Sequence, residues 1–72
     1  MTARQAAARD GARWGRWLAR AELLGPASAY AVWWRSEDAL LAVAPDVRRH
    51  WQLACARARQ RERRAQYRAV PL

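Results

Sequence analysis

Lysine and phenylalanine are absent from this sequence of 72 residues, and cysteine and histidine occur once each. With Cys55 as its only cysteine the chain cannot close a disulfide within itself, which predicts an intracellular, reducing compartment. No uncharged stretch approaches the about 20 apolar residues that a membrane-spanning helix needs. A chain of this length forms one domain at most, and so small a core gives little net stability. We therefore expect residues 1–72 to form a single small domain whose order depends on a bound partner.

The same scarcity argues against catalysis and metal binding. His50 and Cys55 are the only candidates for a base and thiol pair, yet side chains five residues apart on a helix point about 140° away from each other. One His and one Cys cannot complete a zinc site without ligands from elsewhere. No glycine-rich phosphate loop follows a strand. We predict a non-enzymatic protein with no cofactor and no metal.

Arginine, by contrast, is in excess. All 14 basic residues are Arg, and against six acids they give a net charge of +8. A GC-rich coding bias would also favour Arg over Lys, but the charge itself predicts an acidic partner: nucleic acid, an anionic membrane surface or an acidic protein face. Residues 1–20 carry five Arg and one Asp, residues 21–46 one Arg and four acids, and residues 47–72 eight Arg and one Glu. Two basic segments thus flank an acidic centre.

Residues 1–24 have the signals of an amphipathic helix. Thr2 and Gln5 have the spacing of a capping box, and Gly25 followed by a proline is a strong stop, so we expect the helix over residues 3–24. Gly11 and Gly15 weaken this helix by about 1 kcal/mol each relative to Ala. They either allow another backbone to approach closely or are simply tolerated.

The pattern of residues 26–44 predicts a second helix in the centre of the chain. Ser36, followed by two acids, would equally cap a new helix and so divide the segment in two. A strand across residues 30–34, where aromatic and β-branched residues are dense, is the third alternative. Pro45 closes the segment and can open the next helix at its first position.

The pattern of residues 46–69 predicts a basic helix roughly 36 Å long. Its second half has only alanines on the apolar side, so we expect it to project from the rest. The expected fold is all-α, with three helices, or four if the centre divides, in a small open bundle with a long projecting Arg-rich C-terminal helix. The apolar stripe that would pack comprises Val47, Trp51, Ala54, Cys55, Ala58, Ala65 and Ala69.

Two rows of arginine are the main candidate sites. The guanidinium groups in each row are about 5–6 Å apart on one helix face, a spacing that can follow phosphates or grip carboxylates. A solvated helix face without function is the alternative. The first row is Arg9, Arg13, Arg16 and Arg20, and the second, with the same spacing, is Arg57, Arg61, Arg64 and Arg68.

Five tryptophans are more than so small a core can enclose. We expect Trp14, Trp33 and Trp51 to form the core, which leaves Trp17 and Trp34 for an interface, where Trp and Arg are enriched. Trp with Arg in the first helix also suits an anionic membrane surface.

These features predict an accessory or adaptor protein, or an inhibitor, that docks through Trp17, Trp34 and the Arg rows onto a larger protein or ribonucleoprotein assembly with an acidic surface. A nucleic-acid-binding regulator or RNA-associated protein that uses the Arg rows is the alternative, and peripheral membrane contact is the third. The Arg- and Ala-rich residues 1–20 also resemble an organelle transit segment, so import into an organelle stays an alternative compartment.

Overall fold

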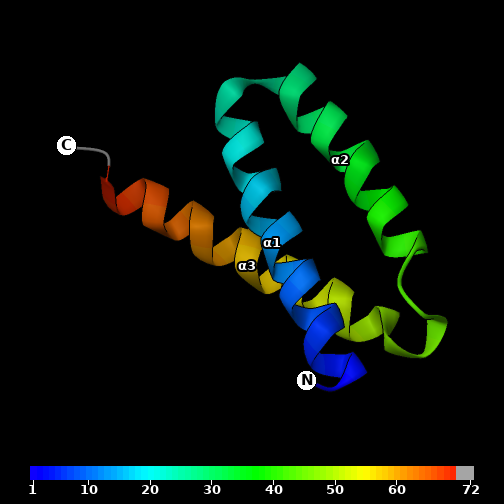
Figure 1. Cartoon of the computed structure of the whole chain (residues 1–72). Coiled ribbons are helices and arrows are strands. Elements are labelled where there is room, and N and C mark those ends of the chain that lie inside the picture. The colour runs from blue at the N-terminus through cyan, green and yellow to red at the C-terminus, as the bar shows by residue number, and fades with distance from the viewer. Residues whose placement is uncertain (70–72) are drawn as a thin grey trace.

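Three α-helices and one short 3-10 helix make up the computed structural model, which describes residues 1–69 and contains no strand within them. The all-α prediction is therefore confirmed. In order, the elements are α1 (Ala3–Leu24), α2 (Pro26–Leu41), the 3-10 helix η1 (Pro45–Val47) and α3 (Arg48–Ala69) (Figure 1).

Local signals set the start and end of α1 as predicted. The Thr2 hydroxyl accepts a hydrogen bond from the Gln5 backbone N–H at 3.1 Å, and the Thr2 backbone N–H donates to the Gln5 side chain at 2.9 Å. After Leu24 the chain turns at Gly25, whose φ of 121° is rarely adopted by other residues. Pro26 then occupies the first turn of α2.

The centre is one helix, as predicted, and neither alternative, a division at Ser36 or a strand across residues 30–34, is found. The buried Ser36 hydroxyl donates to the carbonyl of Trp33 at 2.6 Å, which keeps this side chain folded against its own helix instead of capping a new one. The helix also ends at Leu41, earlier than expected. Arg48 holds this end, because its guanidinium donates to the carbonyls of Val43 at 2.9 Å and Leu41 at 3.0 Å.

Helices α1 and α3 run in the same direction and touch backbone to backbone. A methyl group at Gly11 would overlap the carbonyl oxygen of Trp51, and one at Gly15 would overlap that of Cys55. Four-residue spacing of small side chains is typical of helices whose ridges interlock at close range. The close-approach interpretation of the two glycines is thus confirmed.

The core lies where α1 and α3 meet and is covered on one side by α2. Helix α2 packs mainly on α1 and hardly touches α3. Trp51 is 4% exposed, as predicted for the core, and Trp14 is half-buried. Trp33 is 42% exposed, so its assignment to the core was wrong: α2 turns the side that carries Val32 and Ser36 inward. The buried core cluster is Ala7, Leu18, Val47, Trp51 and Cys55.

Apolar packing along α3 fades after Ala58, and Ala65 is exposed. The last turns of α3 lead away from the end of α1 (Figure 1). The second half of α3 therefore lacks apolar burial, as expected, but ion pairs still connect it to α1. The side chain of Ala69, predicted as the end of the apolar stripe, lies outside the described residues. None of the helices within residues 1–69 combines the length and apolar character needed to cross a bilayer.

Candidate interaction surfaces

The three acids of the basic helices all lie where α1 and α3 meet. Glu22 on α1 accepts hydrogen bonds from Arg59 at 2.6 Å and from both Nε and Nη2 of Arg63, at 3.0 and 2.6 Å. Burial alone would raise the pKa of Glu22, but the hydrogen bonds from Arg63 and Arg59 outweigh it and hold the pKa below its usual range. The carboxylate is therefore ionised at neutral pH and ties α3 to α1.

Asp10 and Glu62 have the same role elsewhere on the interface. Asp10 accepts from the indole N–H of Trp51 at 2.9 Å and from Arg13 at 2.8 Å, and Glu62 accepts from Arg20 at 2.9 Å. Two members of the first predicted row, Arg13 and Arg20, are thus engaged within the chain.

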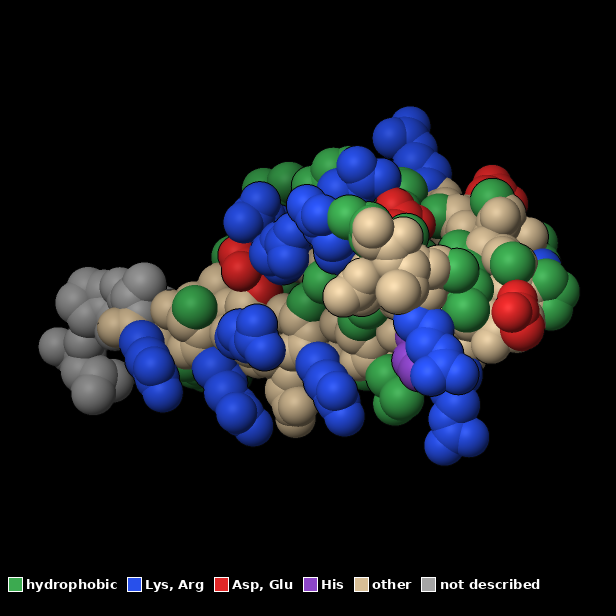
Figure 2. All heavy atoms as spheres, turned by 60° about the horizontal axis from the view of Figure 1, so that its bottom comes forward, with side chains coloured by type: hydrophobic (Ala, Val, Ile, Leu, Met, Phe, Trp, Pro, Cys, Tyr) green, Lys and Arg blue, Asp and Glu red, His purple; other side chains and the backbone are tan. Residues whose placement is uncertain are grey.

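The other six arginines of the two rows have no ion pair within residues 1–69. Every member of both rows is exposed, on the side of its helix that faces away from the core. Figure 2 shows Arg side chains in two groups on one face of the molecule, a row that leads toward the C-terminal end and a cluster above it. We call the two rows, one on α1 and one on α3, together the Arg face. The unpaired members are Arg9, Arg16, Arg57, Arg61, Arg64 and Arg68.

The exposed side of α2, unlike the Arg face, is mainly apolar. Of its exposed residues only Arg35 and Asp38 are charged, and their charges are of opposite sign. The ring centroids of Trp33 and Trp34 lie 5.0 Å apart. The ring centroid of Tyr30 lies 6.4 Å from that of Trp33 and 6.0 Å from that of Trp34. Leu41, 68% exposed, continues this surface toward the end of the helix. We call Tyr30, Trp33, Trp34 and Leu41 the α2 ridge.

Trp17 belongs to a different aromatic cluster from Trp34. Its ring meets Trp14 edge to face at 4.9 Å, and the guanidinium of Arg13 lies 5.2 Å from its centroid. The two tryptophans predicted for an interface are both exposed, at 42% and 50%, but the structure does not place them in contact with a common neighbour. This separation could not be predicted from local patterns, because it depends on how α2 packs on α1.

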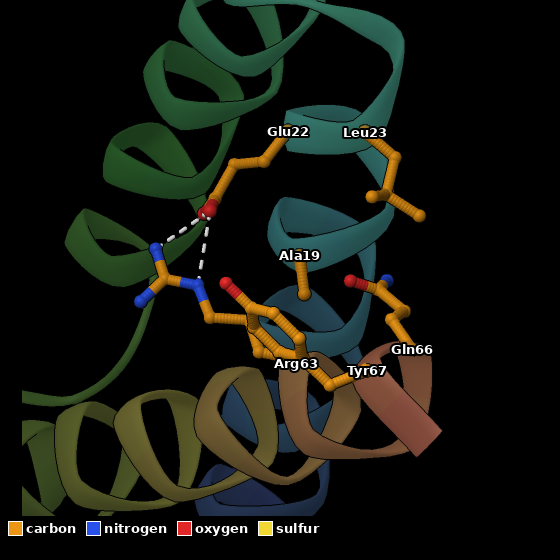
Figure 3. Close-up of a pocket in the computed structure, with 6 residues that line it drawn as sticks. All are labelled: Ala19, Glu22, Leu23, Arg63, Gln66 and Tyr67. Atoms are coloured by element: carbon orange, nitrogen blue, oxygen red, sulfur yellow. Dashed lines mark hydrogen bonds and ion pairs between the residues drawn. The ribbon is translucent and has the colours of Figure 1, made fainter. Parts of the chain in front are cut away.

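A hollow of about 370 Å³ lies between the ends of α1 and α3. Figure 3 shows Arg63 reaching across it to the carboxylate of Glu22, with Gln66 and Tyr67 on the α3 side. The buried Nε2 of Gln66 has no hydrogen-bond partner among the described residues. The one carboxylate that lines this hollow, Glu22, is already paired with Arg63. This ion pair joins the two helices and leaves the hollow little further chemistry.

The remaining titratable candidates, Cys55 and His50, lie at separate positions on α3. Burial raises the pKa of the Cys55 thiol, and the positive charge of Arg59 offsets only part of the rise, so the thiol stays protonated at neutral pH. His50 is half-buried one turn earlier on α3. Within residues 1–69, no three side chains of His, Cys, Asp or Glu gather in a group that could hold a metal ion.

No family model matches this chain, and neither a curated protein nor a solved structure matches it.

Proposed function

We propose that this protein binds the phosphate backbone of nucleic acid through its Arg face and has no enzymatic activity. The observation that supports this proposal most is the distribution of charge on α1 and α3. Their three acids are all engaged at the interface between the helices, while six guanidinium groups of the two rows have no ion pair among the described residues. The positive charge is therefore turned outward.

The linear order of these cations favours a phosphate backbone over an acidic protein surface. Arginines repeat along each helix about once per turn, and a nucleic-acid backbone presents anions at similarly regular intervals. Each guanidinium can also form paired hydrogen bonds with phosphate oxygens. Contacts of this kind to phosphates carry no sequence information directly, so we expect binding that depends little on sequence.

The test is fluorescence anisotropy of a labelled random-sequence DNA duplex, and of a structured RNA, titrated with the full chain over a series of salt concentrations. The slope of log K against log salt should be about −4 if the four arginines of the α3 row neutralise four phosphates on duplex DNA, and about −5 if the six unpaired arginines of both rows do so. Absence of binding to both probes at low salt would rule the proposal out.

An adaptor role on an acidic protein assembly is the second candidate. It is supported by Trp17, because an exposed Trp with the guanidinium of Arg13 over its ring combines the two residue types most enriched at binding hot spots. This role predicts that Trp17→Ala abolishes capture of a protein partner and leaves DNA binding within about twofold, since Trp17 is not part of the Arg rows. Equal loss of both activities would contradict the distinction.

A further inference from the structure

Within residues 1–69, each of the two basic helices carries one exposed aromatic side chain. Trp17 on α1 stays 42% exposed although Arg13 and Trp14 both contact its ring. Tyr67 on α3 is 83% exposed, the highest value among the large apolar side chains of the described residues. The other aromatic residues of these helices, Trp14 and Trp51, are half-buried and buried. Two aromatic rings on α1 and α3 are thus open to a partner.

The neighbours of both rings on the helix surface are members of the Arg rows. Residues three or four positions apart on a helix lie side by side, so Trp17 has Arg13 and Arg20 as neighbours and Tyr67 has Arg64. The guanidinium of Arg13 lies 5.2 Å from the centroid of the Trp17 ring. A nucleotide whose phosphate is held by either row therefore has its base within reach of an aromatic ring.

The α1 row also frames a place for a phosphate group. Arg9, Arg13 and Arg16 line a hollow of about 280 Å³ together with Asp10. The Asp10 carboxylate already accepts two hydrogen bonds from the chain, at 2.8 and 2.9 Å. Three guanidinium groups against one engaged carboxylate leave the hollow positive, and Arg13 connects it to the ring of Trp17.

We propose that the nucleic acid bound by the Arg face is single-stranded, and that Trp17 and Tyr67 each stack on one of its bases. This inference rests on the proposed binding of a phosphate backbone. Within a duplex the flat faces of the bases are covered by their neighbours, so an aromatic ring beside a row of cations has no base to stack on. In a single strand these faces are open, and proteins that bind single strands combine a cationic track with aromatic side chains.

An abasic strand separates the contribution of the bases from that of the phosphates. The full chain is titrated, at one salt concentration, into labelled oligothymidine and into an abasic oligomer with the same number of phosphates, and binding is followed by fluorescence anisotropy. We expect oligothymidine to be bound at least about fivefold more tightly than the abasic oligomer. Oligouridine of the same length distinguishes RNA from DNA as the preferred strand, and the inference requires that at least one of the two exceed the abasic oligomer.

The double variant Trp17→Ala with Tyr67→Ala tests the two rings. It should bind oligothymidine and the abasic oligomer with affinities within about twofold of each other, and its affinity for the DNA duplex should stay within about twofold of wild type. Tyr30→Ala with Trp34→Ala is the matched control, because it removes one exposed Tyr and one exposed Trp from the α2 ridge, outside both rows. This control should keep the full preference for oligothymidine, and both variants should keep their helicity by circular dichroism.

Two results would overturn the inference while leaving the proposed backbone binding in place. One is equal affinity of the wild-type chain for the abasic oligomer and for both strands that carry bases. The other is a preference for bases that survives Trp17→Ala with Tyr67→Ala. Absence of binding to every probe, the DNA duplex included, would instead reject the proposed function and this inference with it.

Discussion

Gly15 lies so close to Cys55 that a methyl group on its α-carbon would overlap the Cys55 carbonyl oxygen. In an exposed helix, Gly→Ala adds about 1 kcal/mol of stability. Here we expect Gly15→Ala to lose about 1–3 kcal/mol, because the obstacle is backbone and α1 must move away from α3. Thermal unfolding followed by circular dichroism measures the change.

The control for Gly15→Ala is Ala6→Ser, which adds one atom at an exposed position of the same helix and should cost only about 0.5 kcal/mol. A melting temperature that rises in Gly15→Ala would show that the two helices are further apart than the structure has them.

Helix boundaries could be predicted from the sequence because their causes are local. The Thr2 capping box and the Gly25 turn lie within a few residues of the ends that they determine. The end of α2 could not be predicted in the same way, because the Arg48 side chain that caps it reaches back from the next helix. Ser36 left a second interpretation open, since the same residue type can cap a new helix or bond to its own.

The Glu22 carboxylate should make stability depend on pH. Its pKa is held low in the folded chain, so its stabilising contribution is complete above the unfolded pKa of about 4.3 and is lost as pH falls through the folded value. We expect Glu22→Gln to cost up to about 1 kcal/mol at pH 7, since its partners are partly exposed.

Thermal unfolding of both proteins between pH 7 and pH 2 tests this dependence on Glu22. The difference between wild type and Glu22→Gln should shrink as pH falls. Asp38→Asn, at an exposed carboxylate without an ion pair in the described part of the chain, serves as control and should show no such convergence. If the difference in stability between wild type and Glu22→Gln did not change with pH, the ion pairs of Glu22 with Arg59 and Arg63 would not contribute to stability.

Trp51 should be the tryptophan on which folding depends. Trp51→Phe removes a hydrogen bond to the charged Asp10 and leaves space in the core, so we expect a loss of about 2–4 kcal/mol in urea unfolding at fixed protein concentration. Trp17→Phe, at an exposed position, should cost less than about 1 kcal/mol. Equal losses would contradict the assignment of Trp51 to the core.

The candidate surfaces could be predicted only in part. Helical periodicity places each Arg row on one face, and that depends on spacing alone. Which arginines are engaged depends on contacts such as Arg63 with Glu22, 41 residues apart, which no local pattern encodes. The exposure of Trp33 was missed for the same reason, because the rotation of α2 is decided by its packing on α1.

The central proposal, that the Arg face binds a phosphate backbone, is tested most directly by two variants that remove equal charge from different places. Arg61→Gln with Arg64→Gln removes two members of the α3 row, and Arg4→Gln with Arg49→Gln removes two exposed arginines outside both rows. In DNA-binding titrations over a range of salt, the row variant should lower the steepness of the salt slope by about 2 and the control should leave it nearly unchanged. Equal slopes in the two variants would show that only net charge matters and would contradict a site on the Arg face.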